Sequence, residues 1–337
     1  MISKNLERKL FMLWKYITLC ALKIESTYKA LGYPLAPITR VIQRPMRWFY
    51  HQSPLLRHDT RFYLKPFLLK IFHVMLVTTY PHDFKIYGNN ISFRSYGSLM
   101  SIQGYYVGEI EYHLVQFVTR QMKPGFVMLD VGAHHGVYTL IAAYELKSRG
   151  WKGIIHSFEP NPYNFSLLTH NVKQNKLGNH VIFHNKAVSD RTCKQKFLFF
   201  PEENSDGQLE SVKDMNKKDT ESSLMKQDVQ VVQLDSILKS VKKVDLIKMD
   251  IQGAELLALQ GGEKLIMRDK PILVIEAVRG WPSTEKIKKF LIKHNYTLHG
   301  VDKHGNLCHI DSPDVFVSWD LIGLPPTKPV EVKFNRL

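Results

Sequence analysis

Short apolar runs alternate with segments of helical apolar spacing through the middle of the chain. The runs predict strands over residues 127–131, 153–158, 180–187, 244–250 and 271–276. The segments between them predict helices over residues 137–148, 161–174 and 253–268, and Gly261 and Gly262 weaken the last helix. Because strands that alternate with helices form parallel sheets covered on both faces, we predict an α/β fold.

Further elements are predicted on either side of this alternation. Apolar spacing indicates helices over residues 109–121 and 283–294. Apolar runs at 296–301 and 313–319 predict two strands that close the sheet as an antiparallel pair. These elements extend the α/β domain to residues 101–325, followed by a tail at 326–337.

A polar insertion interrupts the domain before its fourth strand. Runs at 195–200 and 229–233 predict short strands, and the segment from Pro201 to Asp228 is poor in apolar residues. We expect this segment to form a long loop over the carboxyl edge of the sheet. Loops of this length are usually functional or disordered, so it is either a lid or a plain insertion.

Residues 1–100 form a separate, basic extension. Residues 1–33 combine apolar and basic positions, which predicts an amphipathic helix that lies on a membrane surface or packs on the protein. Its apolar stretch is too short and too charged to span a bilayer. A helix is predicted over residues 62–80, and a hairpin over 84–94 around Gly88-Asn89-Asn90.

Charge is concentrated in this extension. The chain has a net charge of +15, and residues 1–100 hold 15 Lys and Arg against 4 Asp and Glu. Such a surface can face anionic lipid, nucleic acid or an acidic substrate, or simply be solvated.

The three cysteines, Cys20, Cys193 and Cys308, are far apart in the sequence and imply no disulfide framework. Their arrangement favours a reducing compartment, so we expect a cytoplasmic protein, with membrane association left open. The histidines near Cys308 fit no standard zinc spacing, and we predict no metal site.

The segment Asp130-Val131-Gly132-Ala133-His134-His135-Gly136 joins the first predicted core strand to its helix. Its glycines allow a ligand to approach the backbone, but the central glycine of a dinucleotide fingerprint is His134 here. This favours a ligand without a pyrophosphate, such as S-adenosyl-L-methionine, over a nicotinamide cofactor. The next strand ends at Glu159, 23 residues after Gly136, where an acid can accept hydrogen bonds from both ribose hydroxyls.

Several motifs occur in order from residue 105 to residue 280. They are Asp130-Val131-Gly132-Ala133, Phe158-Glu159-Pro160-Asn161-Pro162, Asn171 and Asn175, Lys186-Ala187-Val188-Ser189-Asp190, Leu234-Asp235-Ser236, and Lys248-Met249-Asp250-Ile251-Gln252-Gly253-Ala254-Glu255. In this set the chain resembles the FkbM family of S-adenosylmethionine-dependent methyltransferases. One position departs from the family, which usually has an acid where Gln252 stands.

The resemblance implies a Rossmann-like class I methyltransferase fold. This is a mostly parallel seven-stranded sheet with helices on both faces, here preceded by a helical N-terminal extension. It also implies a cofactor site made by Glu111, Asp130, Gly132, Ala133, Gly136, Glu159, Asn161, Ala187, Val188 and Asp250.

Methyl transfer needs a positioned acceptor and, where the acceptor carries a proton, a base. Strand alternation puts Lys248 and Asp250 on the same side, next to the expected methyl group, although a structural ion pair is the alternative. Glu276 ends the following strand and is a second candidate base. Candidate catalytic residues are therefore Lys248, Asp250 and Glu276, and candidate substrate-binding residues are His135, Gly253 and Glu255.

The resemblance implies O-methylation of a hydroxyl on a sugar, glycolipid or secondary metabolite. The first alternative is a nucleic-acid methyltransferase, motivated by the basic charge. The Asn/Asp-Pro-Pro-aromatic motif of base methylation is replaced here by Asp250-Ile251-Gln252-Gly253, and no specific nucleic-acid partner is predicted. The second is a non-catalytic protein that keeps the cofactor fold and binds anionic membrane through its basic extension. The sequence leaves the oligomeric state open.

Overall fold

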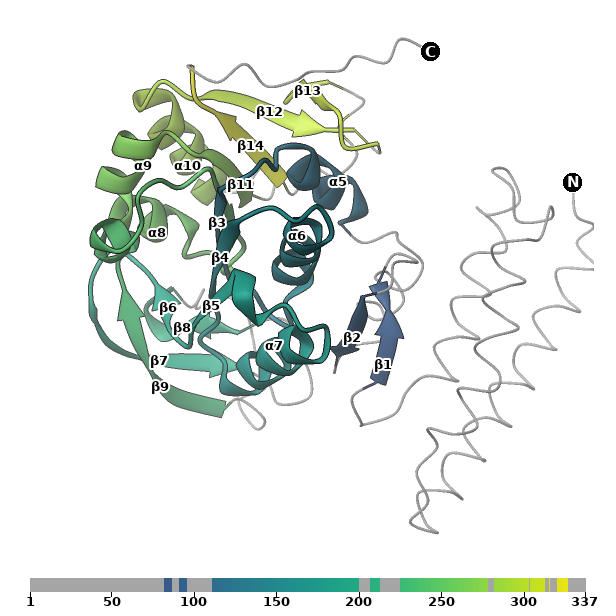
Figure 1. The fold of residues 1–337 in the computed structure, drawn as a ribbon. Coiled ribbons are helices and arrows are strands. Elements are labelled where there is room, and N and C mark those ends of the chain that lie inside the picture. Colours follow the sequence, from purple (N-terminus) through teal and green to yellow (C-terminus); the bar gives the residue numbers. More distant parts are fainter. Residues whose placement is uncertain are drawn as a thin grey trace, which may run out of the picture. The chain divides into compact units, whose positions relative to one another are not determined.

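The computed structural model is shown in Figure 1. It describes residues 82–86, 91–95, 111–199, 207–212, 225–277, 282–302, 304–312, 315 and 320–326. Apart from His82, these residues belong to one compact unit, Asp83–Ser95 together with Gly108–Leu337. The predicted helices at 1–33 and 62–80, the turn of the hairpin and the tail from 327 lie outside the described residues.

The main sheet has eight strands, and its order is β13-β12-β14-β11-β10-β3-β4-β5. From one edge to the other the bounds are β13 Leu307–His309, β12 Thr297–Val301, β14 Asp320–Leu324, β11 Ile272–Glu276, β10 Leu246–Met249, β3 Phe126–Val131, β4 Gly153–Phe158 and β5 Val181–His184. The strands from β5 to β11 are parallel, whereas β14 is antiparallel to both of its neighbours. The expected α/β sheet is confirmed, and β13 adds an eighth strand to the predicted seven.

Helices cover both faces of this sheet (Figure 1). One face carries α5 Tyr112–Arg120, α6 Val137–Ser148 and α7 Pro162–Gln174, and the other carries α8 Glu255–Gly261, α9 Glu263–Asp269 and α10 Pro282–Lys293. On the second face, apolar side chains from β3, β10 and β11 pack against all three helices in one buried cluster. Short 3₁₀ turns lie at Gly178–His180, Glu210–Val212 and Leu234–Lys239.

The break between α8 and α9 corrects the single helix predicted over residues 253–268. Gly262 lies between the two helices, as the paired glycines suggested. Gly261 is also constrained by packing, since a Cβ there would overlap the carbonyl oxygen of Ser189. Of the strand predicted at 313–319, only Val315 lies within the described residues, and the strand that pairs with β11 and β12 there is Asp320–Leu324.

A second sheet replaces part of the predicted long loop. Its order is β6-β9-β7-β8, with β6 Ala187–Val188, β7 Cys193–Phe199, β8 Gln208–Leu209 and β9 Met225–Val232. Strands β7 and β9 pair antiparallel over their length. Lys196 and Asp228 form a 2.8 Å ion pair between them, on solvent-exposed positions. Because the first residues of β9 are polar and exposed, the sequence pattern did not predict them as part of a strand. The rest of the proposed lid lies outside the described residues.

The same sheet corrects the strand predicted over residues 180–187. Strand β5 ends at His184, and Ala187 and Val188 form β6, which pairs with β9 instead of continuing β5. Both residues are buried. Ala187 and Val188, which we expected near the adenine at the end of β5, therefore belong to the second sheet, whereas β5 belongs to the main sheet.

The predicted hairpin is confirmed as a two-stranded sheet of β1, His82–Lys85, and β2, Ser92–Ser95. Side chains of α7 hold β2 in place. Asn175 Oδ1 accepts a 2.8 Å hydrogen bond from Ser92 N, and Asn171 Oδ1 accepts a 2.7 Å bond from Arg94 N. Across the described residues, no helix has the length and apolar character needed to cross a bilayer.

Candidate active site

The turn between β3 and α6 lies where the direction of the sheet order reverses. Chain continuity runs from β3 outward to β4 and β5, and then returns to β10 on the other side of β3. Ligands of open α/β sheets bind in the crevice at this switch point. Gly132, with φ +80°, lies against the end of β10, and a Cβ there would overlap the carbonyl oxygen of Asp250. Only glycine fits this contact.

Asp130 ends β3 as a fully buried carboxyl group. Its Oδ2 accepts hydrogen bonds from Thr139 N at 3.1 Å and from Thr139 Oγ1 at 2.6 Å. Its Oδ1 has no hydrogen-bond partner within the part of the chain that the structure describes. Burial raises the pKa of Asp130, against the opposing effects of Lys248 and Thr139. One oxygen is thus fixed by the protein, and the other remains able to accept a bond from a ligand.

Glu159 follows β4 and is fixed by backbone amides. Its Oε2 accepts from His134 N at 2.8 Å, and its Oε1 accepts from Asn161 N at 2.9 Å. His134 reaches this position with φ +53°, in the left-handed region. Burial raises the pKa of Glu159 to about 7, although both amide bonds act in the opposite direction. Each carboxylate oxygen keeps a second lone pair for a ligand hydroxyl.

Asn161 is the N-cap of α7. Its Oδ1 accepts a 2.9 Å hydrogen bond from Tyr163 N, which is the usual role of asparagine at this position. Its Nδ2 is buried and has no partner among the described residues. Because unpaired buried donors are rare in folded proteins, this amide is a second polar group left for a ligand.

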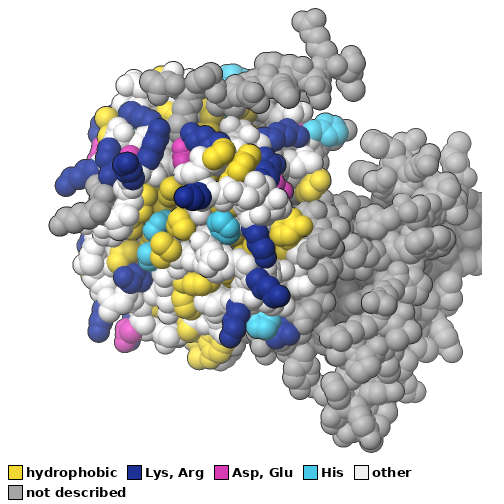
Figure 2. Space-filling model, in the orientation of Figure 1, with side chains coloured by type: hydrophobic (Ala, Val, Ile, Leu, Met, Phe, Trp, Pro, Cys, Tyr) yellow, Lys and Arg dark blue, Asp and Glu magenta, His cyan; other side chains and the backbone are white. Residues whose placement is uncertain are grey.

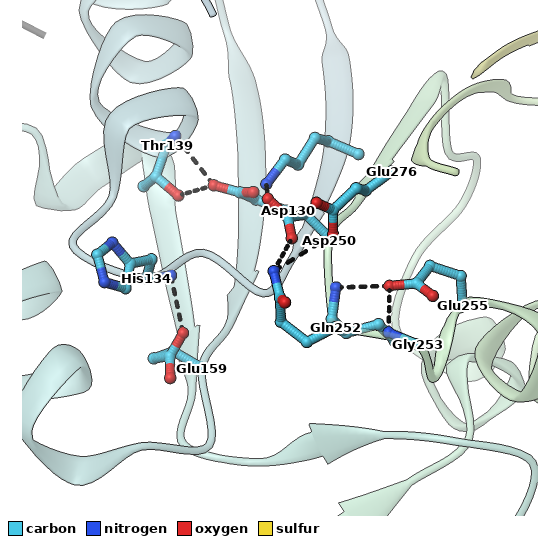
Figure 3. A network of polar contacts seen from close by, with 11 residues as sticks. Asp130, His134, Thr139, Glu159, Asp250, Gln252, Gly253, Glu255 and Glu276 are labelled. Carbon is cyan, nitrogen blue, oxygen red and sulfur yellow. Dashed lines mark hydrogen bonds and ion pairs between the residues drawn. The ribbon is translucent and has the colours of Figure 1, made fainter. Parts of the chain in front are cut away.

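The other half of the site lies at the end of β10, with Lys248 in the strand and Asp250 directly after it. Figure 3 shows Asp250 beside Gln252 and Glu276. Lys248 Nζ is 3.3 Å from Asp250 Oδ2 and lies over the Tyr138 ring, 4.9 Å from its centroid. Burial favours neutral lysine, but Asp250, Asp130 and Glu111 outweigh it and raise the pKa of Lys248. Burial likewise opposes ionisation of Asp250, yet Lys248 holds its pKa below the ordinary range. The pair is therefore ionic at neutral pH.

Glu276 ends β11 beside this pair. Burial and the charge of Asp250 raise the pKa of Glu276 to about 10. A carboxyl group with this pKa is protonated at neutral pH and is a poor base there. The role of Glu276 as a second general base stays a prediction, and Asp250 is the carboxylate whose pKa Lys248 lowers.

Two residues predicted to bind substrate have structural partners instead. Glu255 is 3% exposed, and its Oε1 accepts bonds from Ile251 N at 3.0 Å and Gly253 N at 3.1 Å. It thereby shapes the turn after β10. His135 is fully buried, with Nδ1 2.8 Å from Ser95 Oγ and Nε2 3.0 Å from Asn164 Oδ1. These contacts hold both side chains within the protein, and a role of either one in substrate binding stays a prediction. Gly253, with φ +99°, stays at the turn as predicted.

Two more acids belong to the same electrostatic cluster. Burial raises the pKa of Glu111 to about 7. Lys248 acts to lower this pKa, and Asp250 and Asp130 act to raise it. Glu111, a predicted cofactor-binding residue, therefore lies near these three groups. Burial also raises the pKa of Asp320, with Glu111 and Asp250 adding to the effect. Sequence reasoning missed Asp320. In the sequence it is only an acid before an apolar run. It lies opposite Glu276 because β14 pairs with β11, and this pairing of distant segments cannot be predicted from the local pattern.

The remaining expectations concern Gly136, Ala133 and metals. Gly136 has φ +94° and precedes α6, and Ala133 N donates a 2.9 Å hydrogen bond to Phe158 O, so both hold the β3–α6 turn in shape. The described residues include no group of three or more His, Cys, Asp or Glu side chains arranged to hold a metal ion.

The doubly wound sheet, its reversed β14 and the crevice after β3 and β4 define a Rossmann-like methyltransferase fold. The family model described as the methyltransferase FkbM domain matches residues 130–298, half of the chain. The chain belongs to this family.

Individual relatives are more distant. The 31-O-demethyl-FK506 methyltransferase FkbM of Streptomyces tacrolimicus is 32% identical over 83 residues, which are 24% of this chain and 29% of that protein. The FkbM methyltransferase structure from Methylobacillus flagellatus is 18% identical, with a TM-score of 0.38, and the match covers 67% of this chain and 53% of that one. The structure of TYW2 from M. jannaschii in complex with AdoMet is 16% identical, with a TM-score of 0.38, covering 73% and 85%. The match thus spans less than a third of the curated relative.

Proposed function

We propose that this protein is an S-adenosylmethionine-dependent O-methyltransferase that acts on a hydroxyl of a sugar, glycolipid or secondary metabolite. The observation that carries the proposal is the pair of buried acids after β3 and β4. Asp130 keeps one oxygen without a partner among the described residues, and Glu159 is fixed through both of its oxygens by backbone amides. Membership of the FkbM family supports methyl transfer. The Streptomyces tacrolimicus relative is named for O-methylation, which supports oxygen as the acceptor atom.

The polar groups left over at the site fit the cofactor. Glu159 would accept hydrogen bonds from the two ribose hydroxyls, as acids at this position do in nucleotide-binding folds. Asp130 Oδ1 would accept from the ammonium group of the methionine part, and Asn161 Nδ2 would donate on the adenosine side. Gly132 allows the β3–α6 turn to pack directly against the carbonyl oxygen of Asp250, which brings the two halves of the site together. The bound cofactor would supply an electrophilic methyl group on its sulfonium.

The residues after β10 would act on the acceptor. Asp250 is 28% exposed and ionised, so it can receive the proton of an acceptor hydroxyl. Lys248 fixes one oxygen of this carboxylate and keeps it charged. This contact orients Asp250, but it also makes Asp250 a weaker base.

The charge around Asp250 favours a neutral acceptor. One lysine, Lys248, faces carboxyl groups from several elements, namely Glu111, Asp130, Asp250, Glu276 and Asp320. A phosphate or carboxylate on the acceptor would meet repulsion from ionised Asp250, and it would further disfavour ionisation of the neighbouring acids. This argues for hydroxylated sugars and lipids with neutral head groups, and against the nucleic-acid alternative.

Transfer of a radiolabelled methyl group from S-adenosylmethionine to a panel of neutral glycosides, glycolipids and polyketides tests the proposal. Label should appear in at least one class. Asp250→Asn should lower the rate at least tenfold, while Asp311→Asn, an exposed acid outside the site, should leave it unchanged. Label found only in RNA or DNA would overturn the O-methyltransferase assignment.

A further inference from the structure

Gln252 is the feature of the site that the proposed chemistry has not used. It lies in the turn after β10 with φ +54°, in the left-handed region. Its Nε2 is 3.3 Å from Asp250 Oδ1 and 3.3 Å from Glu276 Oε2. Figure 3 shows dashed lines from the Gln252 amide to Asp250 and Glu276. Lys248 Nζ contacts the other oxygen of Asp250, Oδ2.

An amide suits this position because of what it can donate. The NH₂ group of glutamine carries two hydrogens, enough for one bond to each carboxyl group. Two carboxyl groups this close cannot both ionise readily, so one of them holds a proton. A glutamate in place of Gln252 would donate nothing when ionised and would add a third acid to the pair.

The turn holds this amide in place. Glu255 accepts bonds from the backbone amides on both sides of Gln252, those of Ile251 and Gly253. Asp250 is then bound through both oxygens, with Oδ2 toward Lys248 and Oδ1 toward Gln252. The plane of the Asp250 carboxylate is fixed by these two contacts.

We propose that Gln252 is a positioning residue that bridges Asp250 and Glu276 and so holds the Asp250 carboxylate in one orientation. This role rests on the proposed function for its catalytic meaning, since Asp250 is the group that would meet the acceptor.

Other charged groups act on the pair, and they set the conditions for a test. They are Lys248 on β10, Asp130 at the end of β3, Glu111 before α5, Glu255 on α8, Asp320 on β14 and His134 in the β3–α6 turn. All of these remain unchanged when only Gln252 is replaced. A shift in titration on replacing Gln252 therefore reports on the bridge itself.

The test follows the Glu276 carboxyl carbon by NMR between about pH 6 and pH 10.5 in ¹³C-glutamate-labelled protein. The resonance is assigned by its loss in Glu276→Gln. In the wild type it should begin to move above about pH 9, since its pKa is about 10. Gln252→Met keeps the length of the side chain and removes the donor. Because a donor stabilises the ionised form, its loss should delay the titration by about one pH unit, a tenfold change in the ratio of ionised to protonated Glu276.

A matched control is Gln233→Met. Gln233 Nε2 donates to the backbone oxygen of Asp190 at 2.8 Å and touches neither carboxyl group, so this variant should titrate like the wild type. Gln252→Glu should bind one additional proton near neutral pH and show a second protonated carboxyl resonance. Superimposable Glu276 titrations in the wild type and Gln252→Met would overturn the bridge, whatever happened to stability.

The outcome is separable from that of the proposed function. Binding of S-adenosylmethionine to the same wild-type sample is measured independently by calorimetry. A delayed titration in Gln252→Met without cofactor binding would support the bridge and refute the proposed function. Cofactor binding with an unchanged titration would do the reverse.

Discussion

Buried carboxyl groups at the ends of the core strands dominate the site at the scale of single residues. Thr139 alone satisfies one oxygen of Asp130, through both its backbone amide and its hydroxyl, and the hydroxyl also lies 2.7 Å from Ser157 Oγ. This contact holds Asp130 in its buried position. Asp130 and Glu159 were predictable because each acid follows an apolar run. The roles of Thr139 and Asp320 were not, because they depend on contacts between distant elements.

Thr139→Val should destabilise the fold. The substitution keeps the shape of the side chain and removes a hydrogen bond to a buried carboxyl group, which costs ~1–3 kcal/mol of the free energy of unfolding. Urea unfolding measures it. Thr169→Val is the control, because its exposed hydroxyl only contacts Ser166 O and its loss should change stability by less than ~0.5 kcal/mol. Equal effects of the two substitutions would show that the Thr139 contact does not hold Asp130.

Glu111 and Glu159 should each contribute stability that falls as pH rises from about 5 to about 8. Their folded-state pKa values are raised to about 7 from the ordinary 4.5, so each of the two groups binds more protons in the folded state than in the unfolded state in this range. The stabilisation is complete below the ordinary pKa and is lost as pH rises through about 7. Urea unfolding at several pH values should show a shallower decline in Glu159→Gln. The same decline in both proteins would exclude Glu159 as a contributor.

Close backbone packing decides where elements begin and end. Periodicity located most core strands and helices to within a few residues, because their buried faces follow the simple repeats of strand and helix. It failed at β9, where exposed Lys226 and Asp228 precede buried Val229 and Val231. It also failed at the break after α8, which depends on the contact between Gly261 and Ser189.

Gly261→Ala should destabilise the protein by ~1–3 kcal/mol, the usual cost of overpacking. The added methyl group would overlap the carbonyl oxygen of Ser189, so α8 or the segment after β6 must shift. Gly178→Ala is matched to it, since Gly178 is exposed and has no atom within 4 Å of an added Cβ. Thermal unfolding compares them, and equal melting temperatures would contradict the packing argument.

At the scale of the whole molecule, the order of motifs predicted the sheet and its functional edge. The switch point between β3 and β10 follows from chain topology, and the acids that gather there come from segments nearly 200 residues apart. The identity of the eighth strand and the second sheet did not follow, because both depend on pairing between segments rather than on local pattern. Residues 1–100, which hold +11 of the net charge of +15, lie largely outside the described residues.

The basic extension gives a prediction for the full chain. We expect the protein to sediment with vesicles that contain anionic lipid, and to lose this property when residues 1–33 are removed. Attraction between basic residues and anionic lipid is screened by salt, so binding should weaken as ionic strength rises. Vesicles of neutral lipid are the control. Unchanged sedimentation after the deletion would refute a membrane role for residues 1–33.

Calorimetric titration of S-adenosylmethionine into the wild type and Glu159→Gln is the most direct measurement of the central claim. We expect micromolar binding to the wild type and none of NADH. Each charge-assisted hydrogen bond to a ribose hydroxyl is worth ~1.5–3 kcal/mol, so Glu159→Gln should weaken binding by about tenfold or more. Glu145→Gln, which only loses a surface pair with Arg149, should bind as the wild type does. Folded wild-type protein that binds no S-adenosylmethionine, or that binds it equally well with Glu159→Gln, would contradict the assignment.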